Sequence, residues 1–438
     1  MVTPEAWLRL CSVEKNTLPR QHLNLWGGPG RFWGCLTQLC SNSYTLDPLL
    51  RNCPKFKFPP DRMQSENCSF FPLKARMTDT NLVPGNTTRD ASTTDLKEGH
   101  TSPIATRGRM GKIAGVQIAG IGTYVPEKIV TNEDLAALGC DSEWIIRRTG
   151  IKERRHAAPD QVTSDLAYEA ALKTLKSAGR TADEVDLIIV ATMTPDHPSP
   201  STACYLQGRL GSVAPAMDVS AACAGFMYAM LTAGQFVATG NSKCALVVGS
   251  DLMSRSVDPK DVKTFPLFGD GAGAAILTPT EKTESSGILS YQLCSEGWGA
   301  DLLRIPAGGT RRQLTPEAFG NGEHFLAMDG RGVFKWAVRV IDESIEQVLA
   351  DANVTADELK LVVMHQANER IIDSAVAGLK LAPEKVLMNL DRYGNTSAAS
   401  IPLVLDDAIA QGRLERGDLV LLCGFGAGLS WGTALMRW

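Results

Sequence analysis

The sequence lacks any long apolar run of the kind that crosses a membrane. Nowhere do 18 or more uncharged apolar residues follow one another, and the nearest approach, residues 219–238, is interrupted by glycine and polar residues. A membrane-spanning helix needs about 20 predominantly apolar residues. We therefore expect no membrane insertion, and we interpret residues 219–238 as a helix buried inside a protein.

An excess of charge of one sign is also missing. The chain has 44 Lys and Arg residues against 48 Asp and Glu residues, which gives a formal net charge of -4 over 438 residues. Nucleic-acid binding depends on clustered positive charge, so we expect no nucleic-acid partner. With 44% hydrophobic and 21% charged residues, the composition predicts a soluble globular protein.

Metal-binding patterns are absent too. There are six His and eleven Cys residues, but no Cys-x-x-Cys pair and no cluster of His and Cys. These are the spacings that hold zinc, so no metal site is expected. The six cysteines that follow residue 110 stand in apolar segments, which is typical of reduced core residues and predicts a cytoplasmic protein.

Residues 1–109 have no sustained helical or alternating periodicity, and their second half is almost wholly polar. Such a segment buries too little apolar surface to offset the entropy lost on ordering. We interpret it as a disordered N-terminal extension. If the true start of the protein is Met110, this segment is an over-extended reading frame and not part of the protein. The alternative is a transit segment, because the first 60 residues hold seven Lys or Arg and only three acids; the location would then be an organelle stroma or matrix.

The rest of the chain contains an internal repeat. Residues 171–190 align without a gap with residues 345–364, and both copies contain helix, Thr-Ala-Asp-Glu turn and apolar strand. Continuous apolar strands that alternate with helices predict sheets covered on both faces. We therefore predict a duplicated α/β fold with an N-terminal half, 110–285, and a C-terminal half, 286–438.

One cysteine stands at a special place in this pattern. Cys223 lies between an extended segment and the small, apolar residues 224–231, which predict a helix buried at the centre of the protein. The start of a helix favours a thiolate, which is the nucleophilic form of cysteine. A packed core cysteine is the alternative reading of the same residues.

Two residues of the second half are candidates to act with this thiol. His365 directly follows the apolar strand 361–364, and the carboxyl ends of strands are where α/β proteins place their chemistry. Asn395 follows Gly394 at a predicted helix start, where it could serve as an N-cap alone. The repeat places that helix start opposite the one at Cys223, so we expect the three side chains to meet at the centre.

Four segments, in this order, closely resemble the signature segments of the β-ketoacyl-acyl-carrier-protein synthase III family. They are residues 218–226, 365–370, 394–400 and 425–432, and the resemblance covers 110–438. It implies the thiolase-like fold, with α-β-α-β-α layers, and an acyltransferase that starts fatty acid synthesis. It also implies a homodimer, and neither a metal nor an organic cofactor.

The resemblance further implies a role for each residue of the site. Cys223 would take the acyl group from a short acyl-CoA. Malonyl-acyl-carrier protein would then lose carbon dioxide, while His365 and Asn395 donate hydrogen bonds to the developing enolate oxygen. The backbone N–H groups of Cys223 and Ala427 would stabilise the oxyanion of the acyl-cysteine.

Substrate contacts also follow from the resemblance. Trp144 and Arg148 match residues that hold the adenine end of coenzyme A. The segment Gln366, Ala367, Asn368, Glu369 and Arg370 matches the acyl-carrier-protein docking region, where a cation suits an acidic partner.

The sequence departs from the family pattern at three places. Val262 stands where many relatives have an arginine near the coenzyme A entrance, although the adjacent Lys263 could replace it. Ala377-Gly378 stand where some relatives carry lysines. Ser199 stands near the position where some relatives place a bulky aromatic residue that limits the acyl pocket.

Other functions of the same fold remain open at this point. A polyketide-type synthase or an acyltransferase without decarboxylation would use the same Cys, His and Asn residues. A non-catalytic acyl-chain scaffold fits less well, because such partners usually lack the nucleophile.

Overall fold

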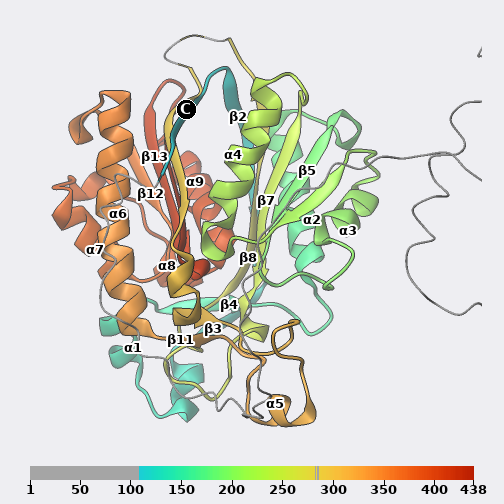
Figure 1. The fold of residues 1–438 in the computed structure, drawn as a ribbon, viewed down its shortest axis with the longest axis vertical. Coiled ribbons are helices and arrows are strands. Elements are labelled where there is room, and N and C mark those ends of the chain that lie inside the picture. The colour runs from blue at the N-terminus through green and yellow to red at the C-terminus, as the bar shows by residue number, and fades with distance from the viewer. Residues whose placement is uncertain (1–107, 282, 284–285) are drawn as a thin grey trace, which may run out of the picture. The chain divides into compact units, whose positions relative to one another are not determined.

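The computed structural model describes residues 108–281, 283 and 286–438 (Figure 1). The predicted disorder of residues 1–109 falls, up to residue 107, outside the described residues.

Two five-stranded mixed sheets organise the described part of the chain. The first sheet has the order β2-β8-β7-β5-β6, with β2 (Val116–Tyr124), β8 (Asp270–Pro279), β7 (Ala245–Leu252), β5 (Leu187–Ala191) and β6 (Ala216–Val219). The second has the order β1-β9-β14-β13-β12, with β1 (Met110–Ile113), β9 (Ile288–Ser295), β14 (Ser430–Arg437), β13 (Leu419–Gly426) and β12 (Leu361–Met364). Two short hairpins pair β3 (Lys128–Thr131) with β4 (Glu153–His156), and β10 (Leu303–Arg304) with β11 (Ala327–Met328).

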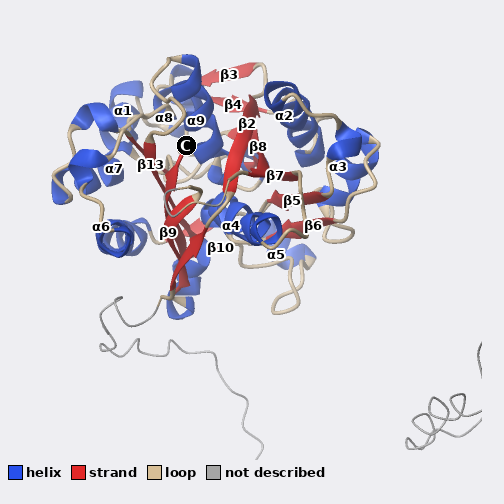
Figure 2. Cartoon of the chain, turned by 90° about the horizontal axis from the view of Figure 1, so that it is seen from above, coloured by secondary structure: helices blue, strands red, loops and turns tan. Residues whose placement is uncertain are grey.

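The helices form three layers around these sheets (Figure 2). Outside the first sheet lie α2 (Thr163–Ala178) and α3 (Thr202–Leu210), and outside the second lie α6 (Gly330–Ala352) and α7 (Glu369–Gly378). Between the sheets lie α4 (Gly225–Ala238) and α9 (Ser400–Ala410). The shorter helices are α1 (Ser142–Thr149), α5 (Pro316–Gly320) and α8 (Leu390–Tyr393). The α-β-α-β-α layering expected from the sequence is confirmed.

The repeat seen in the sequence recurs in the structure. Thr181 and Thr355 each begin a short 3₁₀ turn, and the backbone N–H of each donates to the Glu side chain three residues later, at 2.8 Å in both copies. These capping boxes satisfy the free N–H groups of the turn. They lead into β5 and β12, which are buried throughout.

A glycine near the start of the described residues divides two strands. Residues 110–124 form β1 and β2, because Gly115 between them adopts a left-handed conformation with φ 74° and turns the chain. As a result β1 pairs with β9 in the second sheet, while β2 pairs with β8 in the first. The boundary at residues 285 and 286 stays a prediction, and β1 crosses from one predicted half to the sheet of the other.

The two central helices are apolar because sheets cover them from both sides. α4 contacts β5 and β7 of the first sheet and β13 and β14 of the second. Residues of α4, α9 and both sheets share one buried cluster. Burial of this kind contributes about 25 cal/mol per Å² of apolar surface, so the centre of the molecule is also its main core.

A buried arginine attaches the β3–β4 hairpin to this core. The Arg154 guanidinium is fully buried and donates to the Val130 carbonyl at 3.1 Å, to Asn132 Oδ1 at 2.8 Å and to the Pro266 carbonyl at 2.8 Å. Burial lowers its pKa to about 10, so it is still charged at neutral pH. Three hydrogen bonds therefore compensate a charge that would otherwise be costly to bury.

We expect Arg154→Ala to lower the free energy of unfolding by about 3 kcal/mol, because it leaves three buried acceptors without their donor. The control is Lys152→Ala, which removes an exposed ion pair with Asp391 at 3.4 Å and should cost less than about 1 kcal/mol. Urea unfolding followed by circular dichroism measures both. Equal losses in the two variants would contradict the role given to Arg154.

Candidate active site

A cavity of about 940 Å³ lies among the described residues at the junction of the two halves. Its lining includes all three residues expected to carry the chemistry, Cys223, His365 and Asn395. These three are buried, whereas Arg148, Lys263 and Arg370 in the same lining are exposed. The cavity therefore connects a buried thiol with the protein surface.

Cys223 lies in the 3₁₀ turn η6 (Ala222–Ala224) that leads directly into α4. The residue before it, Ala222, has a φ of 46°, which is uncommon for a residue other than glycine. This sharp turn is a local departure from the helix that the sequence predicted at this point. It brings the cysteine into the cavity instead of into the helix interior.

The sequence-based expectation of a thiolate is wrong for this state of the protein. Burial raises the pKa of the Cys223 thiol to about 12. Removal from water disfavours the charged form, and here that effect outweighs the helix start. The free protein consequently holds a neutral thiol at pH 7.

A buried hydroxyl and a buried carboxyl lie behind the thiol. Burial raises the pKa of the Asp251 carboxyl as well as that of the Cys223 thiol; the Ser397 hydroxyl beside both opposes the rise, but lacks the geometry of a full hydrogen bond to either. Asp251 Oδ1 accepts from the Met193 N–H at 2.8 Å, and Oδ2 from the Ala398 N–H at 3.2 Å. Our sequence reasoning missed both residues. The sequence did contain a sign of Asp251, because an acidic residue inside the mainly apolar segment 245–252 is unusual.

His365 lies directly after β12, as predicted, and its N–H donates to the Cys423 carbonyl at 2.8 Å. Its ring meets the Phe425 ring edge-on, with centroids 5.1 Å apart, and Nδ1 lies 2.7 Å from Ser400 Oγ. Burial lowers the pKa of His365 to about 3. A neutral imidazole is a weak base, but its single N–H remains a hydrogen-bond donor.

Asn395 is held by the backbone on both sides. Its N–H donates to the Leu267 carbonyl at 2.8 Å, and its carbonyl accepts from the Gly269 N–H at 3.1 Å. The side-chain Oδ1 accepts from the Ser397 N–H at 2.9 Å. Because Oδ1 already has a partner, the Nδ2 amide group is the donor that Asn395 can offer to a ligand in the cavity.

The structure refines how the two halves correspond at this centre. Ser397, like Ala222, has a positive φ, of 52°, and each of them belongs to the 3₁₀ turn before a central helix. This match aligns Cys223 with Ala398, not with Asn395. Asn395 therefore stands three residues before the position that corresponds to Cys223, and the two helix starts meet as the repeat predicts.

The glycine-rich end of β13 passes directly beside the cysteine. A methyl group on Gly426 would lie 2.8 Å from the backbone N of Cys223 and 2.9 Å from its Cβ. Only a glycine allows this approach. Ala427, the next residue, begins the turn η12 (Ala427–Leu429) and lines the cavity.

Trp144 and Arg148 both come from α1 and both line the cavity. The Arg148 guanidinium lies over the Trp144 ring, 4.5 Å from its centroid, which is a cation–π arrangement. Val262, one of the departures from the family pattern, packs with Trp144 in the same small apolar cluster, while Lys263 is exposed. Both residues line the cavity.

The segment 366–370 divides into residues that reach the cavity and residues that do not. Ala367, Asn368 and Arg370 line it. Gln366 is buried, with Nε2 donating to the Met364 carbonyl at 2.8 Å and Oε1 accepting from the Asn389 N–H at 3.1 Å. The prediction that Gln366 contacts a carrier protein is thus wrong, because both ends of its amide bind the protein itself.

The neighbouring residues behave differently. Asn368 caps α7 by accepting from the Arg370 N–H at 3.0 Å, and its Nδ2 donates to the Arg148 carbonyl at 3.1 Å. Glu369 packs against Gly150, where an added methyl group would lie 2.5 Å from Oε2. Asn368 therefore connects the segment proposed for the carrier with the helix proposed for coenzyme A.

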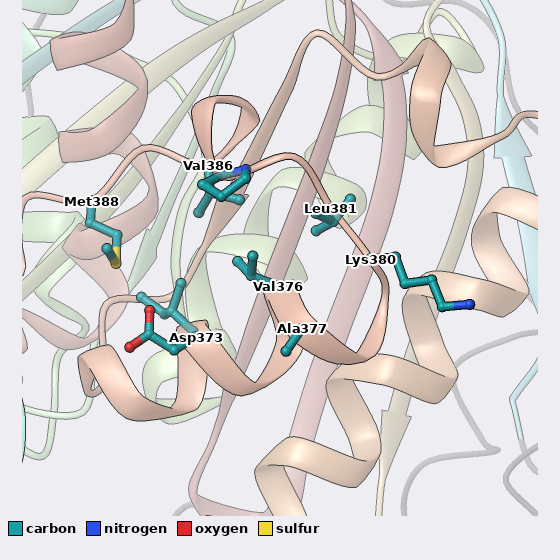
Figure 3. Close-up of a pocket in the computed structure, with 9 residues that line it drawn as sticks. Asp373, Val376, Ala377, Lys380, Leu381, Val386 and Met388 are labelled. Atoms are coloured by element: carbon teal, nitrogen blue, oxygen red, sulfur yellow. The ribbon is translucent and has the colours of Figure 1, made fainter.

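A second cavity of about 360 Å³ lies on the outer side of α7 (Figure 3). Its lining is mainly apolar and includes Ala377, one of the positions that departs from the family pattern. Gly378, the other, faces α6, and a methyl group there would lie 2.6 Å from the Asp342 carboxylate. None of the residues predicted for the site lines this second cavity.

Several other expectations can be compared with the described residues. His156 lies in the half-buried strand β4, where burial lowers its pKa to about 4. Cys204 is exposed rather than buried. Ser199 is exposed and does not line the large cavity.

Within residues 108–281, 283 and 286–438, no helix has the length and apolar content needed to cross a membrane. In the same ranges, no three His, Cys, Asp or Glu side chains are grouped so that they could hold a metal ion.

The raised pKa of the thiol leads to a pH prediction. Below its pKa, the thiolate fraction of Cys223 grows about tenfold for each pH unit, so alkylation by iodoacetamide should accelerate about tenfold per pH unit between pH 7 and pH 10, without levelling off. Peptide mass spectrometry after timed quenching measures it. Cys423 serves as the internal control, because it is fully buried in β13 and should stay unmodified. A plateau that begins near pH 8 would contradict the burial argument.

Comparisons with known proteins identify the family of this chain. The chain matches the family described as 3-oxoacyl-[acyl-carrier-protein] synthase III over residues 217–297, and the C-terminal part of that family over residues 349–438. A β-ketoacyl-[acyl-carrier-protein] synthase III of Rhodopirellula baltica is 64% identical over 345 residues, covering 75% of this chain and 100% of the relative. One of Symbiobacterium thermophilum is 51% identical over 329 residues, covering 75% and 99%.

Solved structures lead to the same family. A crystal structure of 3-oxoacyl-[acyl-carrier-protein] synthase III from Aquifex aeolicus is 42% identical, with a TM-score of 0.68, and the match covers 74% of this chain and 100% of that one. The resemblance found in the sequence is confirmed. The chain belongs to the β-ketoacyl-[acyl-carrier-protein] synthase III family and is a condensing acyltransferase of the thiolase-like fold.

Proposed function

We propose that this chain joins a short acyl group to malonyl-acyl-carrier protein and so starts a fatty acid. The observation that carries the proposal is the convergence of Cys223, His365 and Asn395 on one cavity that opens to the surface. Acyl-CoA and malonyl-acyl-carrier protein are the substrates. No metal and no organic cofactor takes part in the proposed reaction.

In the first half-reaction the Cys223 sulfur attacks the thioester carbon of acyl-CoA. The new bond joins sulfur to the acyl carbon, the bond to the coenzyme A sulfur breaks, and the thiol proton ends on the departing coenzyme A thiol. The oxyanion that forms in between would accept hydrogen bonds from the backbone N–H groups of Cys223 and Ala427. The close approach of Gly426 to Cys223 supports this assignment.

In the second half-reaction malonyl-acyl-carrier protein loses carbon dioxide, and the electrons of the broken bond form an enolate. His365 and Asn395 donate hydrogen bonds to its oxygen. Its carbon then attacks the acyl-cysteine, and Cys223 leaves and regains a proton. The low pKa of His365 supports this division of work, because a neutral donor stabilises an oxyanion without first having to lose a proton.

The apolar part of the cavity is suited to an acyl chain. Met193, Met253, Phe268, Leu303 and Leu326 all line it, and apolar side chains favour an alkyl ligand over water. Ser199 lies outside this lining within one chain, so it does not limit the acyl pocket from within the chain.

We further propose a homodimer and a cytoplasmic location. β6 is the edge strand of the first sheet, and Val213 and Met217 expose apolar surface beside it, which a second copy could cover. The mass of the protein in solution tests the dimer. All six cysteines among the described residues are free thiols, which favours a reducing compartment, and cell fractionation tests that location.

We expect Cys223→Ala to abolish acylation, whereas His365→Ala and Asn395→Ala should keep it within a few-fold and slow carbon dioxide release by about 100- to 1000-fold each. Mass spectrometry of the acylated chain and release of labelled carbon dioxide from malonyl-acyl-carrier protein measure the two steps. Acylation without carbon dioxide release by the unmodified protein would reject condensation in favour of simple acyl transfer. Loss of acylation alone in all three variants would reject the oxyanion assignment.

Substitution of each of two exposed arginines that line the cavity should change the KM for only one of the two substrates. Arg148→Ala should raise the KM for acyl-CoA about fivefold, as expected for the loss of about 1 kcal/mol from a cation at an exposed aromatic site, and leave the KM for malonyl-acyl-carrier protein unchanged. Arg370→Ala should do the reverse, and its effect should fade at high salt. Steady-state kinetics with each substrate varied in turn makes each variant the control for the other. Equal effects on both KM values would contradict the assignment.

A further inference from the structure

The catalytic histidine contacts a buried serine that no part of the proposed mechanism uses. Ser400 is the first residue of α9, and its Oγ lies 2.7 Å from His365 Nδ1. Both side chains are 1% exposed. The contact therefore directly joins α9, the central helix of the second half, to the residue that follows β12.

A neutral imidazole carries its proton on one of two nitrogens, and the partner of the other nitrogen decides which. If Nδ1 held the proton, it would donate to Ser400, and the Ser400 hydroxyl would need another acceptor for its own proton. Within the part of the chain that the structure describes, His365 Nδ1 is the hydrogen-bond partner of that hydroxyl. A buried O–H without an acceptor costs about 1–3 kcal/mol.

The arrangement in which Ser400 donates satisfies both groups. The hydroxyl proton then points to Nδ1, and the imidazole proton is on Nε2, at the opposite edge of the ring. His365 lines the cavity, so this places a donor where a ligand oxygen can lie. The Phe425 ring packs edge-on against the imidazole, with the ring centroids 5.1 Å apart.

We propose that Ser400 is a positioning residue that holds His365 in the Nε2–H tautomer, so that the ring presents a donor and not a lone pair to the cavity. The inference rests on the proposed function, in which His365 stabilises an enolate oxygen. The first half-reaction makes no use of this donor. Ser400 should consequently affect decarboxylation and condensation and leave acylation of Cys223 unaffected.

The first test is the split between the two half-reactions in the full chain. Ser400→Ala should slow carbon dioxide release about 10- to 100-fold, as is typical when the residue that orients a catalytic histidine is lost. Acylation measured by mass should stay within about twofold. Ser400→Thr retains the hydroxyl and should restore most of the rate, which a purely steric role of the serine would not predict.

The control is a serine of matched burial outside the site. Ser344 is fully buried in α6, and its Oγ lies 2.8 Å from Thr433 Oγ1. Ser344→Ala removes the same hydroxyl at a comparable cost in stability, but carbon dioxide release should remain at the rate of the unmodified protein. An equal loss in both variants would reduce Ser400 to a structural role and overturn the proposal.

The second test observes the tautomer itself. In the unmodified protein labelled with nitrogen-15 histidine, the His365 signals, assigned by comparison with His365→Asn, should show a protonated Nε2 and a bare Nδ1. Ser400→Ala should show a mixture of tautomers. A proton on Nδ1 in the unmodified protein overturns the proposal even if Ser400→Ala does not fold.

The two tests also separate this proposal from the proposed function. If the protein acylates but releases no carbon dioxide, the condensing function fails, whereas the spectrum still decides the tautomer. If it condenses normally with the proton on Nδ1, the function stands and the role of Ser400 is rejected.

Discussion

The close packing of two helix starts at the centre of the molecule is the constraint on which the site depends. The turns before α4 and α9 meet across the junction of the halves, and glycines make room for them. A methyl group on Gly249 would lie 2.4 Å from the Ala398 carbonyl oxygen, and one on Gly426 would lie 2.8 Å from the Cys223 nitrogen. Backbones that approach this closely leave no freedom to shift, so the side chains that start from them are equally fixed.

The same packing keeps the catalytic thiol and imidazole uncharged at neutral pH. Burial keeps the Cys223 thiol protonated, with a pKa of about 12, and His365 uncharged, with a pKa of about 3. Donors fixed by the packing need little reorganisation when charge develops on a bound thioester, and such fixed donors stabilise the charge more strongly than mobile water does. Asp251, in β7, is the buried acid of this region, and its carboxyl accepts hydrogen bonds from the backbone N–H groups of Met193, after β5, and Ala398, before α9.

The errors of the sequence analysis have physical causes that can be named. The left-handed conformation of Gly115 sends β1 and β2 to different sheets, and a glycine in an apolar segment does not by itself reveal such a turn. Gln366 has the composition of a surface residue, yet its amide satisfies a carbonyl and an N–H inside the protein. The thiolate was expected from the helix start alone, because the depth of burial that opposes it cannot be seen along the chain.

Local pattern alone determined the repeat, the capping boxes at Thr181 and Thr355, the buried central helix and the identity of the three residues that meet in the cavity. These features depend on neighbours three or four residues apart or on a repeated segment, so the sequence contains them. Only the tertiary structure decided that Ser400 contacts His365, that Ser397 interacts with Cys223 and Asp251, and that Asn395 presents Nδ2 to the cavity. The contacts of Ser400 with His365 and of Ser397 with Cys223 and Asp251 join residues 35 to 174 positions apart, and even the short contact that turns Asn395 depends on how two sheets press the central helices together.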